Sequence, residues 1–393
     1  NALFYAILDI ADLKQRRIIF QPTINQEGYE FIQGRPVVRA LLKQLADQVT
    51  AVVALGHRTL DVQFCREANI PVTIIPNGTR MLTPAFDFRE TYHIPRDQFL
   101  IVHVANLYRV KNHIGLLREL RDLPPRAKLA IVGHPTHETE YVEEVRRALE
   151  TRPDVLYVPG LNRGGVAAAI HAADIIVLAS DAEVSPLCIL EAMSLKRAWI
   201  ATPGCGTAND QAGGLILPLD KFRSAVACLM QHPDYRTQLA RSGYDHWQAC
   251  FQWESVLAGW MSLVHTGYLS GSFDTPATIA HTRDALRAQY DRLGRNESEA
   301  SLETHPQARS ASSPGFLTPI PISRPAVPPT HAIPTHEAPM DQDPFYVNMF
   351  VKSPAWSTPE PNQDEAARWS KIAGFMEYIL RRFKTTHPDS SLR

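Results

Sequence analysis

Two glutamates with seven residues between them, Glu183 and Glu191, lie in the segment of this chain with the clearest chemical pattern. The apolar stretch "ADIIVLAS" ends just before Glu183 and is typical of a buried strand, whereas "PLCILEAMSLK" after it has helical spacing. We predict that Ser185 caps this helix and that Pro186 takes its first position. Free N–H groups at such a helix start, over Ser185 to Leu187, favour phosphate oxygens. The segment therefore predicts an anion site flanked by two carboxylates.

The two carboxylates are expected to have different roles. Glu191 falls in the second turn of the predicted helix, where its carboxylate can accept hydrogen bonds from the vicinal hydroxyls of a sugar. Glu183, in the loop, would face the group that is transferred. The ordinary alternatives are a loop glutamate paired with a surface base, a helix-surface glutamate and a plain helix start. The spacing alone is common by chance, so the prediction depends on the flanking residues.

Four further stretches occur in a fixed order along the chain. They are "IIPNG" at 74–78, "FLIVHVANLYRVKNHIGLL" at 99–117, "VLYVPG" at 155–160 and "FQWESVLAGWMSLV" at 251–264. Together with the segment around the two glutamates, they resemble the retaining GT-B glycosyltransferases, which have two Rossmann-like domains, and in particular family 4, the glycosyl transferases group 1. The resemblance covers roughly residues 15 to 266. Five ordered motifs are much more specific than any single one.

The resemblance implies a role for each stretch. The first is similar to the hinge between the two domains, and the second to the first strand, phosphate loop and helix of the donor-binding domain. The third resembles the strand and turn beside the nucleotide base, which makes Gly160 and Leu161 candidates for flanking that base, although "PG" is also a generic turn. The fourth resembles the closing helix, which returns towards the first domain.

The phosphate loop supplies the remaining candidate donor-binding residues. Lys111 lies just before Asn112, a candidate helix cap, and could neutralise the diphosphate of the donor as charge grows on the leaving group. The usual alternative is a solvated lysine in a first helical turn. This chain has Ala105–Asn106 where the family usually has Gly-Arg, so a neutral hydrogen-bond donor replaces the second cation. Arg109, at a different place in the loop, is the candidate for restoring that charge.

The reaction that the resemblance implies is transfer of a sugar from a nucleotide-diphosphate-sugar donor, with retention of anomeric configuration and without metal or other cofactor. Glu183 is the candidate catalytic residue. In the path expected for the family, the leaving phosphate oxygen accepts the proton of the acceptor. The acceptor, a glycan, lipid or protein, is not identified by the sequence. Analogy with the family suggests polysaccharide biosynthesis at a bacterial cell surface.

Composition excludes several other classes of protein. With 40 basic and 41 acidic residues the net charge is −1, so nucleic acid and anionic lipid are not expected partners. The longest apolar runs have the length of strands, which predicts no transmembrane segment and no signal peptide. We expect a cytoplasmic protein, or one peripheral at the inner face of the membrane. The five cysteines are scattered and lack metal-ligand spacing, so they are predicted to be buried thiols.

The middle of the chain alternates strand and helix patterns, which predicts an α/β fold of GT-B architecture with a doubly wound parallel sheet. Five nearly all-apolar strands are expected, namely "QFLIVHVA", "AKLAIVG", "VLYVP", "DIIVLAS" and "AWIAT". Helices are predicted near 112–122, 137–151, 164–172, 186–196, 219–231, 233–248 and 253–266. Residues 99–268 are therefore predicted to be a donor-binding Rossmann-like domain with closing helices. The histidines His103, His134 and His171 are predicted to be strand, turn and helix residues.

The amino-terminal part is shorter than a Rossmann-like half. Residues 1–78 contain three strand candidates, "RRIIFQP", "TAVVALG" and "PVTIIP", where about five or six are usual. We expect an incomplete acceptor-side domain, followed by a hinge or linker over 79–98, in a chain that is a fragment. The family holds its acceptor and commonly a catalytic histidine in the part that we expect to be missing. His57 is the first candidate for that role if the sheet proves to be complete.

The carboxyl-terminal part changes character. Thirteen of the 30 prolines fall between Pro306 and Pro361, so residues 269–361 are predicted to be a Pro/Ser-rich, partly disordered linker. Helical periodicity returns from about 363 to 383, within a predicted segment 362–393. There "WSTPEPNQDEAARW" weakly resembles the lead-in to S-adenosylmethionine-dependent methyltransferases. An interaction helix or a disordered tail explains this segment equally well, and no methyltransferase activity is inferred.

Three other functions make different demands on the sequence. A dinucleotide-dependent oxidoreductase needs Gly-x-Gly-x-x-Gly after a strand, and neither "IVGHPT" nor "PGCGTAND" supplies it. A phosphorylase of related architecture needs a lysine that holds pyridoxal phosphate, to which nothing in the sequence points. A catalytically weak sugar-nucleotide-binding module, or a fragment of a larger multidomain glycosyltransferase, stays open because of Asn106 and the short first domain.

Overall fold

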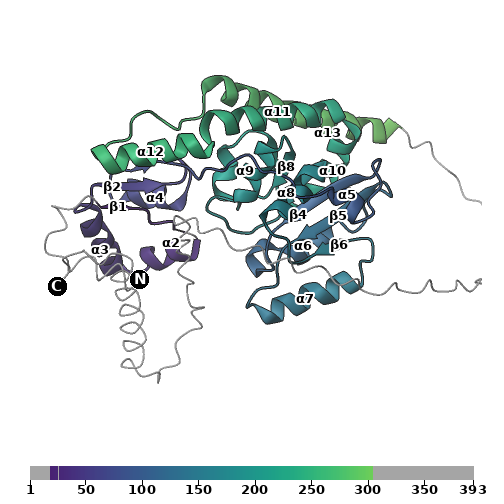
Figure 1. Cartoon of the computed structure of the whole chain (residues 1–393), viewed down its shortest axis with the longest axis horizontal. Helices are drawn as coiled ribbons and strands as arrows, with labels where there is room; N and C mark the ends of the chain where they lie inside the picture. The colour runs from purple at the N-terminus through teal and green to yellow at the C-terminus, as the bar shows by residue number, and fades with distance from the viewer. Residues whose placement is uncertain (1–17, 25, 304–393) are drawn as a thin grey trace, which may run out of the picture. The chain divides into compact units, whose positions relative to one another are not determined.

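The computed structural model describes residues 18–24 and 26–303, in which helices pack against parallel β-sheets (Figure 1). The predicted helix at 362–393, most of the predicted linker and the methyltransferase-like segment lie outside these residues.

The central element is a six-stranded, all-parallel sheet with the strand order β6-β5-β4-β7-β8-β9. Each of the five predicted strands is present, and β9 is an addition that the sequence pattern did not indicate. Every strand except β6 and β9 has at least four residues, and most of their side chains are buried. The strands are β4 (Phe99–Val104), β5 (Ala127–Val132), β6 (Leu156–Val158), β7 (Ile175–Leu178), β8 (Ala198–Ala201) and β9 (Gly214–Ile216).

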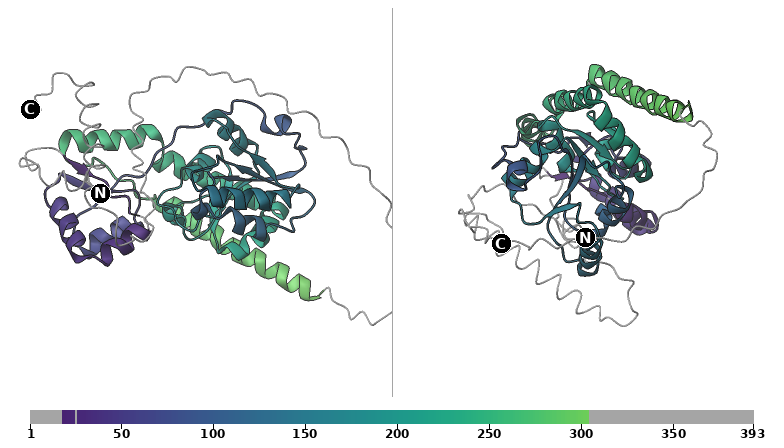
Figure 2. Two further views of the ribbon diagram at one scale, coloured as in Figure 1. Left: turned by 90° about the horizontal axis from the view of Figure 1, so that it is seen from below. Right: turned by 90° about the vertical axis from the view of Figure 1, so that its right-hand side faces the viewer.

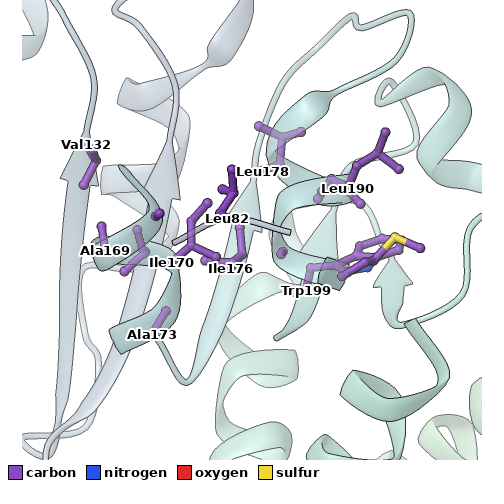
Figure 3. Close-up of a cluster of buried hydrophobic side chains, with 14 of the residues drawn as sticks. Leu82, Val132, Ala169, Ile170, Ala173, Ile176, Leu178, Leu190 and Trp199 are labelled. Atoms are coloured by element: carbon purple, nitrogen blue, oxygen red, sulfur yellow. The ribbon is translucent and has the colours of Figure 1, made fainter. Parts of the chain in front are cut away.

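Helices cover both faces of this sheet because successive side chains of each strand point to opposite faces. On one face, Ile176 and Trp199 pack with Ile170 and Leu190 from two helices (Figure 3). On the other face, Ile101, Val177 and Ile200 share a second buried cluster with other helices. The covering helices are α6 (His113–Glu119), α7 (Thr139–Glu150), α8 (Arg163–Ala172), α9 (Leu187–Ser194), α10 (Phe222–Gln231) and α11 (Pro233–Cys250). This doubly wound arrangement confirms the predicted fold class.

A smaller parallel sheet has the order β1-β2-β3 and is formed by the three predicted amino-terminal strands. In helix α12 (Trp253–Thr266), Val256 and Leu263 share a buried cluster with Val53 and Ile75 of this region. The closing helix thus returns to the amino-terminal part, as the resemblance implied. The elements of this part are β1 (Ile19–Phe20), α2 (Gln26–Gln33), α3 (Pro36–Ala46), β2 (Ala51–Ala54), α4 (Leu60–Glu67) and β3 (Thr73–Ile74). The short helix α5 (Phe88–Thr91) belongs instead to the large sheet, where Phe88 joins the cluster of Ile176 and Trp199.

A long helix, α13 (Ala277–Glu303), lies in the range that we predicted as linker. That prediction is wrong for residues 277–303. Leu286 is buried, and Tyr290 and Leu293 pack against the same cluster, so a face with i, i+4, i+7 spacing anchors the helix. The Tyr235 hydroxyl of α11 also donates a hydrogen bond of 2.8 Å to the Leu286 carbonyl. The helix therefore runs along α11 (Figure 1 and Figure 2).

Candidate active site

The candidate site lies at the carboxyl ends of β4 and β7. The chain adds β5 and β6 on one side of β4, and then β7, β8 and β9 on the other side. In open α/β sheets such a reversal of strand order creates a crevice outside the carboxyl ends of the two central strands, where ligands bind. The loop after β4 carries Lys111, and the loop after β7 carries Glu183. The strand order thus brings together two candidates that lie far apart in the sequence.

Lys111 and Glu183 form an ion pair between Nζ and Oε1. The Lys111 side chain is 22% exposed and the Glu183 side chain 14%, so the pair is largely shielded from solvent but still accessible to a ligand. The Ser180 hydroxyl donates a second hydrogen bond, of 2.9 Å, to the same carboxylate oxygen. The Glu183 side chain therefore does not project into solvent, and it is not paired with an unrelated basic residue on the surface. Its partner is the cation predicted to bind the donor.

Backbone and side-chain contacts hold the two loops together beside this pair. Asp181 N donates to the Val110 carbonyl at 2.8 Å, and the Asn112 amide donates to the Asp181 carboxylate at 3.0 Å. Asn112 also caps α6, since its Oδ1 accepts from Gly115 N at 3.0 Å, which confirms the predicted cap. These contacts fix the place of Lys111, which ends the short 3₁₀ helix η2 (Arg109–Lys111).

Asn106 and Arg109 are both engaged with neighbouring segments. The amide oxygen of Asn106 accepts from His134 N at 3.0 Å. The Arg109 guanidinium lies 3.2 Å from the Glu144 carboxylate and stacks over the Tyr141 ring at 4.7 Å. Arg109 is thus directed to α7, and a phosphate role would require it to leave Glu144. Its predicted role in restoring the missing charge stays a prediction.

The start of α9 differs from our prediction by one residue. The helix runs from Leu187 to Ser194, its N-cap is Pro186, and Pro186 has an extended backbone with ψ of 111°. The predictions of Ser185 as cap and Pro186 as first helical residue are therefore wrong. The Ser185 hydroxyl instead accepts a hydrogen bond of 3.1 Å from the Thr207 hydroxyl. The helix start still follows the acidic loop directly, and Leu187 is its first residue.

Glu191 is partly buried in the second turn of α9. Burial raises the pKa of its carboxyl to about 7, and the opposing effect of Arg163 is smaller. A carboxyl with this pKa changes charge near neutral pH, which an exposed helix-surface glutamate does not do. The environment of Glu191 therefore differs from that of an ordinary surface residue, whereas its contact with a sugar stays a prediction.

Gly160 and Leu161 follow β6, the edge strand on the β5 side of the sheet. Gly160 has a φ of +81°, and a Cβ added there would meet no atom within 4 Å. Glycine is therefore favoured at this turn by the positive φ and not by close packing. The Leu161 carbonyl lies 3.4 Å from Nε2 of His134. This places the predicted base-flanking turn beside the His134 turn, which follows β5.

A buried pair of histidines lies beneath the loop that follows β4. His103 in β4 and His113 in α6 have ring centroids 4.8 Å apart, and Nδ1 of His103 lies 2.9 Å from the Val177 carbonyl. His113 Nε2 lies 3.3 Å from the Ala105 carbonyl, at the start of the loop. Burial lowers the pKa of His103 to about 3 and that of His113 to about 4, so both rings are neutral at pH 7. Sequence reasoning placed His103 in a strand but missed the pair, because no spacing relates the two positions.

Two other predicted features have a defined place. His57 follows β2, and its Nε2 lies 2.9 Å from the Asp274 carboxylate. All five cysteines are free thiols, four of them buried and Cys188 intermediate.

Among residues 18–24 and 26–303, no three His, Cys, Asp or Glu side chains are grouped as metal ligands. Within the same residues no helix has both the length and the apolar character needed to cross a membrane.

A doubly wound parallel sheet with its loops joined at the switch point, and a closing helix that returns to a second parallel sheet, are the features of the GT-B fold. Residues 85–215 match the family described as "Glycosyl transferases group 1", the family whose name the sequence motifs suggested. No curated protein sequence matches the chain.

Solved structures of the same fold include HepE from Anabaena in a complex with UDP and glucose. It has 17% identity and a TM-score of 0.54, over 64% of this chain and 73% of that one. Sucrose-phosphate synthase from Thermosynechococcus elongatus has 20% identity and a TM-score of 0.51, over 58% of this chain and 61% of that one. A glycosyltransferase from Rickettsia africae has 15% identity and a TM-score of 0.51, over 63% and 70%. At these identities the likeness establishes the fold alone.

Proposed function

We propose that this chain transfers a sugar from a nucleotide-diphosphate-sugar donor to an acceptor. The observation that carries the proposal is the meeting of Lys111, Glu183 and the start of α9 at the switch point of the sheet. A cation and free helix N–H groups suit a diphosphate, and a carboxylate beside them suits the transferred group. Support also comes from HepE, a protein of the same fold whose structure contains UDP and glucose.

The diphosphate would be held between Lys111 and the first N–H groups of α9, with the Asn106 amide as a neutral donor. In the ligand-free protein Lys111 is already paired with Glu183. A bound diphosphate would have to share that ammonium, so binding and the charge on Glu183 are coupled. This arrangement supplies positive charge from the protein itself, which supports our proposal that the transfer needs no metal.

Glu191 would accept hydrogen bonds from vicinal hydroxyls of a bound sugar, and Glu183 would face the transferred group. We propose transfer with retention of configuration. In that reaction the acceptor oxygen bonds to the anomeric carbon, the bond from that carbon to the phosphate oxygen breaks, and the phosphate oxygen takes the acceptor proton. The acceptor is a glycan, a lipid or a protein, and polysaccharide assembly in the cytoplasm or at the inner face of the membrane is the setting that we propose.

A second candidate function is a sugar-nucleotide-binding module with little catalytic activity. One observation favours it. The family position usually occupied by arginine is Asn106, and Arg109, which would replace the charge, is held by Glu144 and Tyr141. Such a protein would bind a nucleoside diphosphate but release product very slowly.

The two candidates are separated by measuring the release of nucleoside diphosphate from UDP-, GDP- and ADP-sugars in chelator, with water as the default acceptor. The enzyme proposal predicts release by the wild type and loss of at least tenfold of kcat in Glu183→Gln. Glu140→Gln, an exposed change on α7, is the matched control and should leave the rate unchanged. Binding without release would favour the binding module, and neither binding nor release would contradict both.

A further inference from the structure

The loop that carries Glu183 is built against a second loop, at residues 203–207. Glu183 N donates to the Gly204 carbonyl at 2.8 Å, and Thr207 N donates to the Val184 carbonyl at 2.9 Å. Gly206 has a φ of +49°, and a Cβ at that position would lie 2.2 Å from the Val184 oxygen. The two backbones therefore touch directly, and the second loop supports one side of the acidic loop.

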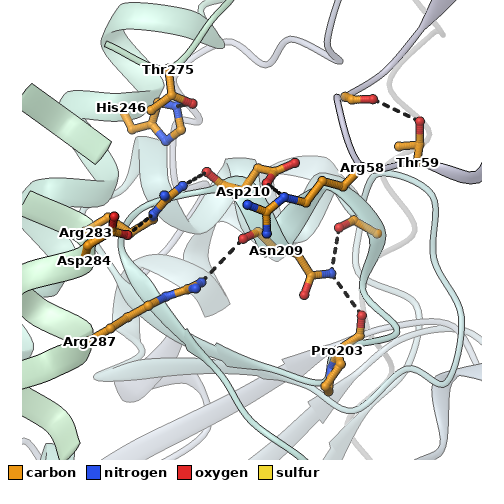
Figure 4. A network of polar contacts seen from close by, with 12 residues as sticks. Arg58, Thr59, Pro203, Asn209, Asp210, His246, Thr275, Arg283, Asp284 and Arg287 are labelled. Atoms are coloured by element: carbon orange, nitrogen blue, oxygen red, sulfur yellow. Dashed lines mark hydrogen bonds and ion pairs between the residues drawn. The ribbon is translucent and has the colours of Figure 1, made fainter. Parts of the chain in front are cut away.

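The second loop continues into the 3₁₀ helix η3 (Gly206–Asp210), which is tied back to the loop's start. The Asn209 amide donates to the Pro203 carbonyl at 2.9 Å and to the Gly206 carbonyl at 2.8 Å. These contacts close residues 203–210 into one compact unit (Figure 4). A displacement at the end of η3 is therefore transmitted to Gly204 and Gly206.

Helix α13 holds the end of this unit. Nη1 of Arg283 donates to the Asp210 carbonyl at 2.9 Å, and Nη2 of Arg287 lies 3.5 Å from the Asn209 carbonyl (Figure 4). The side chain of Arg283 is only 15% exposed. Charged donors satisfy carbonyls that the last turn of a helix leaves without an internal partner. The Asp210 carboxylate pairs separately with Arg58, at 2.9 Å from Nε.

The helix that presents these arginines is fixed by the core rather than by the loop. Leu286, between the two arginines in sequence, is buried in the cluster under the sheet, and its carbonyl accepts from Tyr235. A continuous set of contacts thus runs from the core through α13 and η3 to the loop of Glu183. The matched family segment ends at residue 215, so α13 lies outside it.

From this geometry we infer that Arg283 is a positioning residue, through which α13 sets the conformation of the acidic loop. The inference rests on the proposed function, because it assigns α13 a part in sugar transfer. Glu183 is proposed to face the transferred group, whereas Lys111 and Glu191 hold the donor. Loss of Arg283 should therefore lower kcat more than it raises the KM for the donor.

The test compares Arg283→Ala with the conservative Arg283→Lys and with Arg292→Ala, an exposed change on the same helix. Amide hydrogen exchange at Glu183 and Thr207 is measured in the ligand-free protein. In Arg283→Ala we expect exchange at both amides to be about tenfold faster, as loss of one charge-assisted hydrogen bond implies. Amides in β4 and β5 should keep their rates, Arg283→Lys should recover most of the protection, and Arg292→Ala should match the wild type.

Donor turnover supplies the second readout. We expect kcat of Arg283→Ala to fall about tenfold while KM changes less than about threefold, with partial recovery in Arg283→Lys. Unchanged exchange at Glu183, or equal acceleration in every strand, would overturn the inference. So would a loss confined to KM. If the wild type turns over no donor, the proposed function fails, and the exchange data alone decide whether α13 controls the loop.

Discussion

Replacing Glu183 with glutamine should tighten the binding of a nucleoside diphosphate while it lowers turnover. In the ligand-free protein the ammonium of Lys111 is paired with the Glu183 carboxylate. A diphosphate that enters the site must attract that ammonium and also approach the carboxylate. Glutamine keeps the size of the side chain, removes its negative charge and frees Lys111. Opposite changes in binding and catalysis are therefore expected from a single substitution.

The magnitude follows from Coulomb's law. At a separation on the order of 6 Å and an effective dielectric constant of about 20, one unit of charge contributes about 2.8 kcal/mol. Both side chains are partly exposed, at 22% and 14%, so we take about half of that value. The result, about 1.4 kcal/mol, is a tenfold decrease in the Kd for UDP in Glu183→Gln. Lys111→Met should raise the Kd at least tenfold, by the same arithmetic.

The assay is calorimetric titration with UDP in chelator at low ionic strength, for the wild type, both single variants and the double variant. Because Lys111 is shared with Glu183 only in the wild type, its removal should cost more in the Glu183→Gln background. Both effects should shrink as salt is raised. An unchanged or weaker affinity of Glu183→Gln would refute the reasoning, as would strictly additive effects.

Three further predictions concern other parts of the described residues. Glu191→Ala should weaken the binding of a nucleotide-sugar, because it removes an acceptor for sugar hydroxyls. Since burial raises the pKa of Glu191 to about 7 and hydroxyl donors favour the carboxylate, affinity should fall as pH falls from 8 to 6, and Glu191→Gln should show no such dependence. Burial lowers the pKa of His103 to about 3, and it lowers the pKa of His113 and of His246, a buried residue of α11, to about 4, below the usual 6.5. Their contribution to stability is therefore present above pH 6.5 and lost as pH falls towards 4, so the Tm should drop steeply over that range. Ile176→Ala, in the fully buried cluster of Figure 3, should lower the free energy of unfolding by about 2–5 kcal/mol in urea titrations.

Each of these predictions has a control and a contradicting result. For Glu191, a pH dependence that persists in Glu191→Gln would assign it to another group. For the histidines, the exposed His137→Gln should keep the acid profile, and a Tm that is flat from pH 6.5 to 4.5 would contradict buried neutral rings. For the core, Leu257→Ala at a half-exposed position of α12 should cost much less than Ile176→Ala, and equal costs would argue against the packing described.

The layered fold could be predicted because its strands are nearly all apolar. Parallel strands buried on both faces typically have that pattern, and each predicted strand of the large sheet is present. The order of the strands could not be predicted in the same way, since it depends on contacts across the sheet. The meeting of Lys111 with Glu183 follows from that order, and the sequence could name both residues only through their motifs.

The errors have physical reasons. Serine is a residue type typical of helix caps. The hydroxyl of Ser185, however, accepts a hydrogen bond from the Thr207 hydroxyl of a distant loop, and the helix begins at Leu187. Helix α13 falls within a range predicted as linker on the basis of prolines that lie beyond it, between Pro306 and Pro361. The i, i+4, i+7 spacing of Leu286, Tyr290 and Leu293 was the signal that would have found it. The contact of Arg283 with η3 joins residues that are far apart in the sequence, and no sequence pattern predicts it.

The most direct test of the central claim is whether the protein binds a nucleoside diphosphate without metal, as shown by calorimetric titration of UDP, GDP and ADP in chelator. We predict saturable binding of at least one of the three, with a stoichiometry near one, and loss of at least tenfold in affinity in Lys111→Met. Folded wild-type protein that binds none of the three, or Lys111→Met that binds as tightly as the wild type, would contradict a donor site at the switch point.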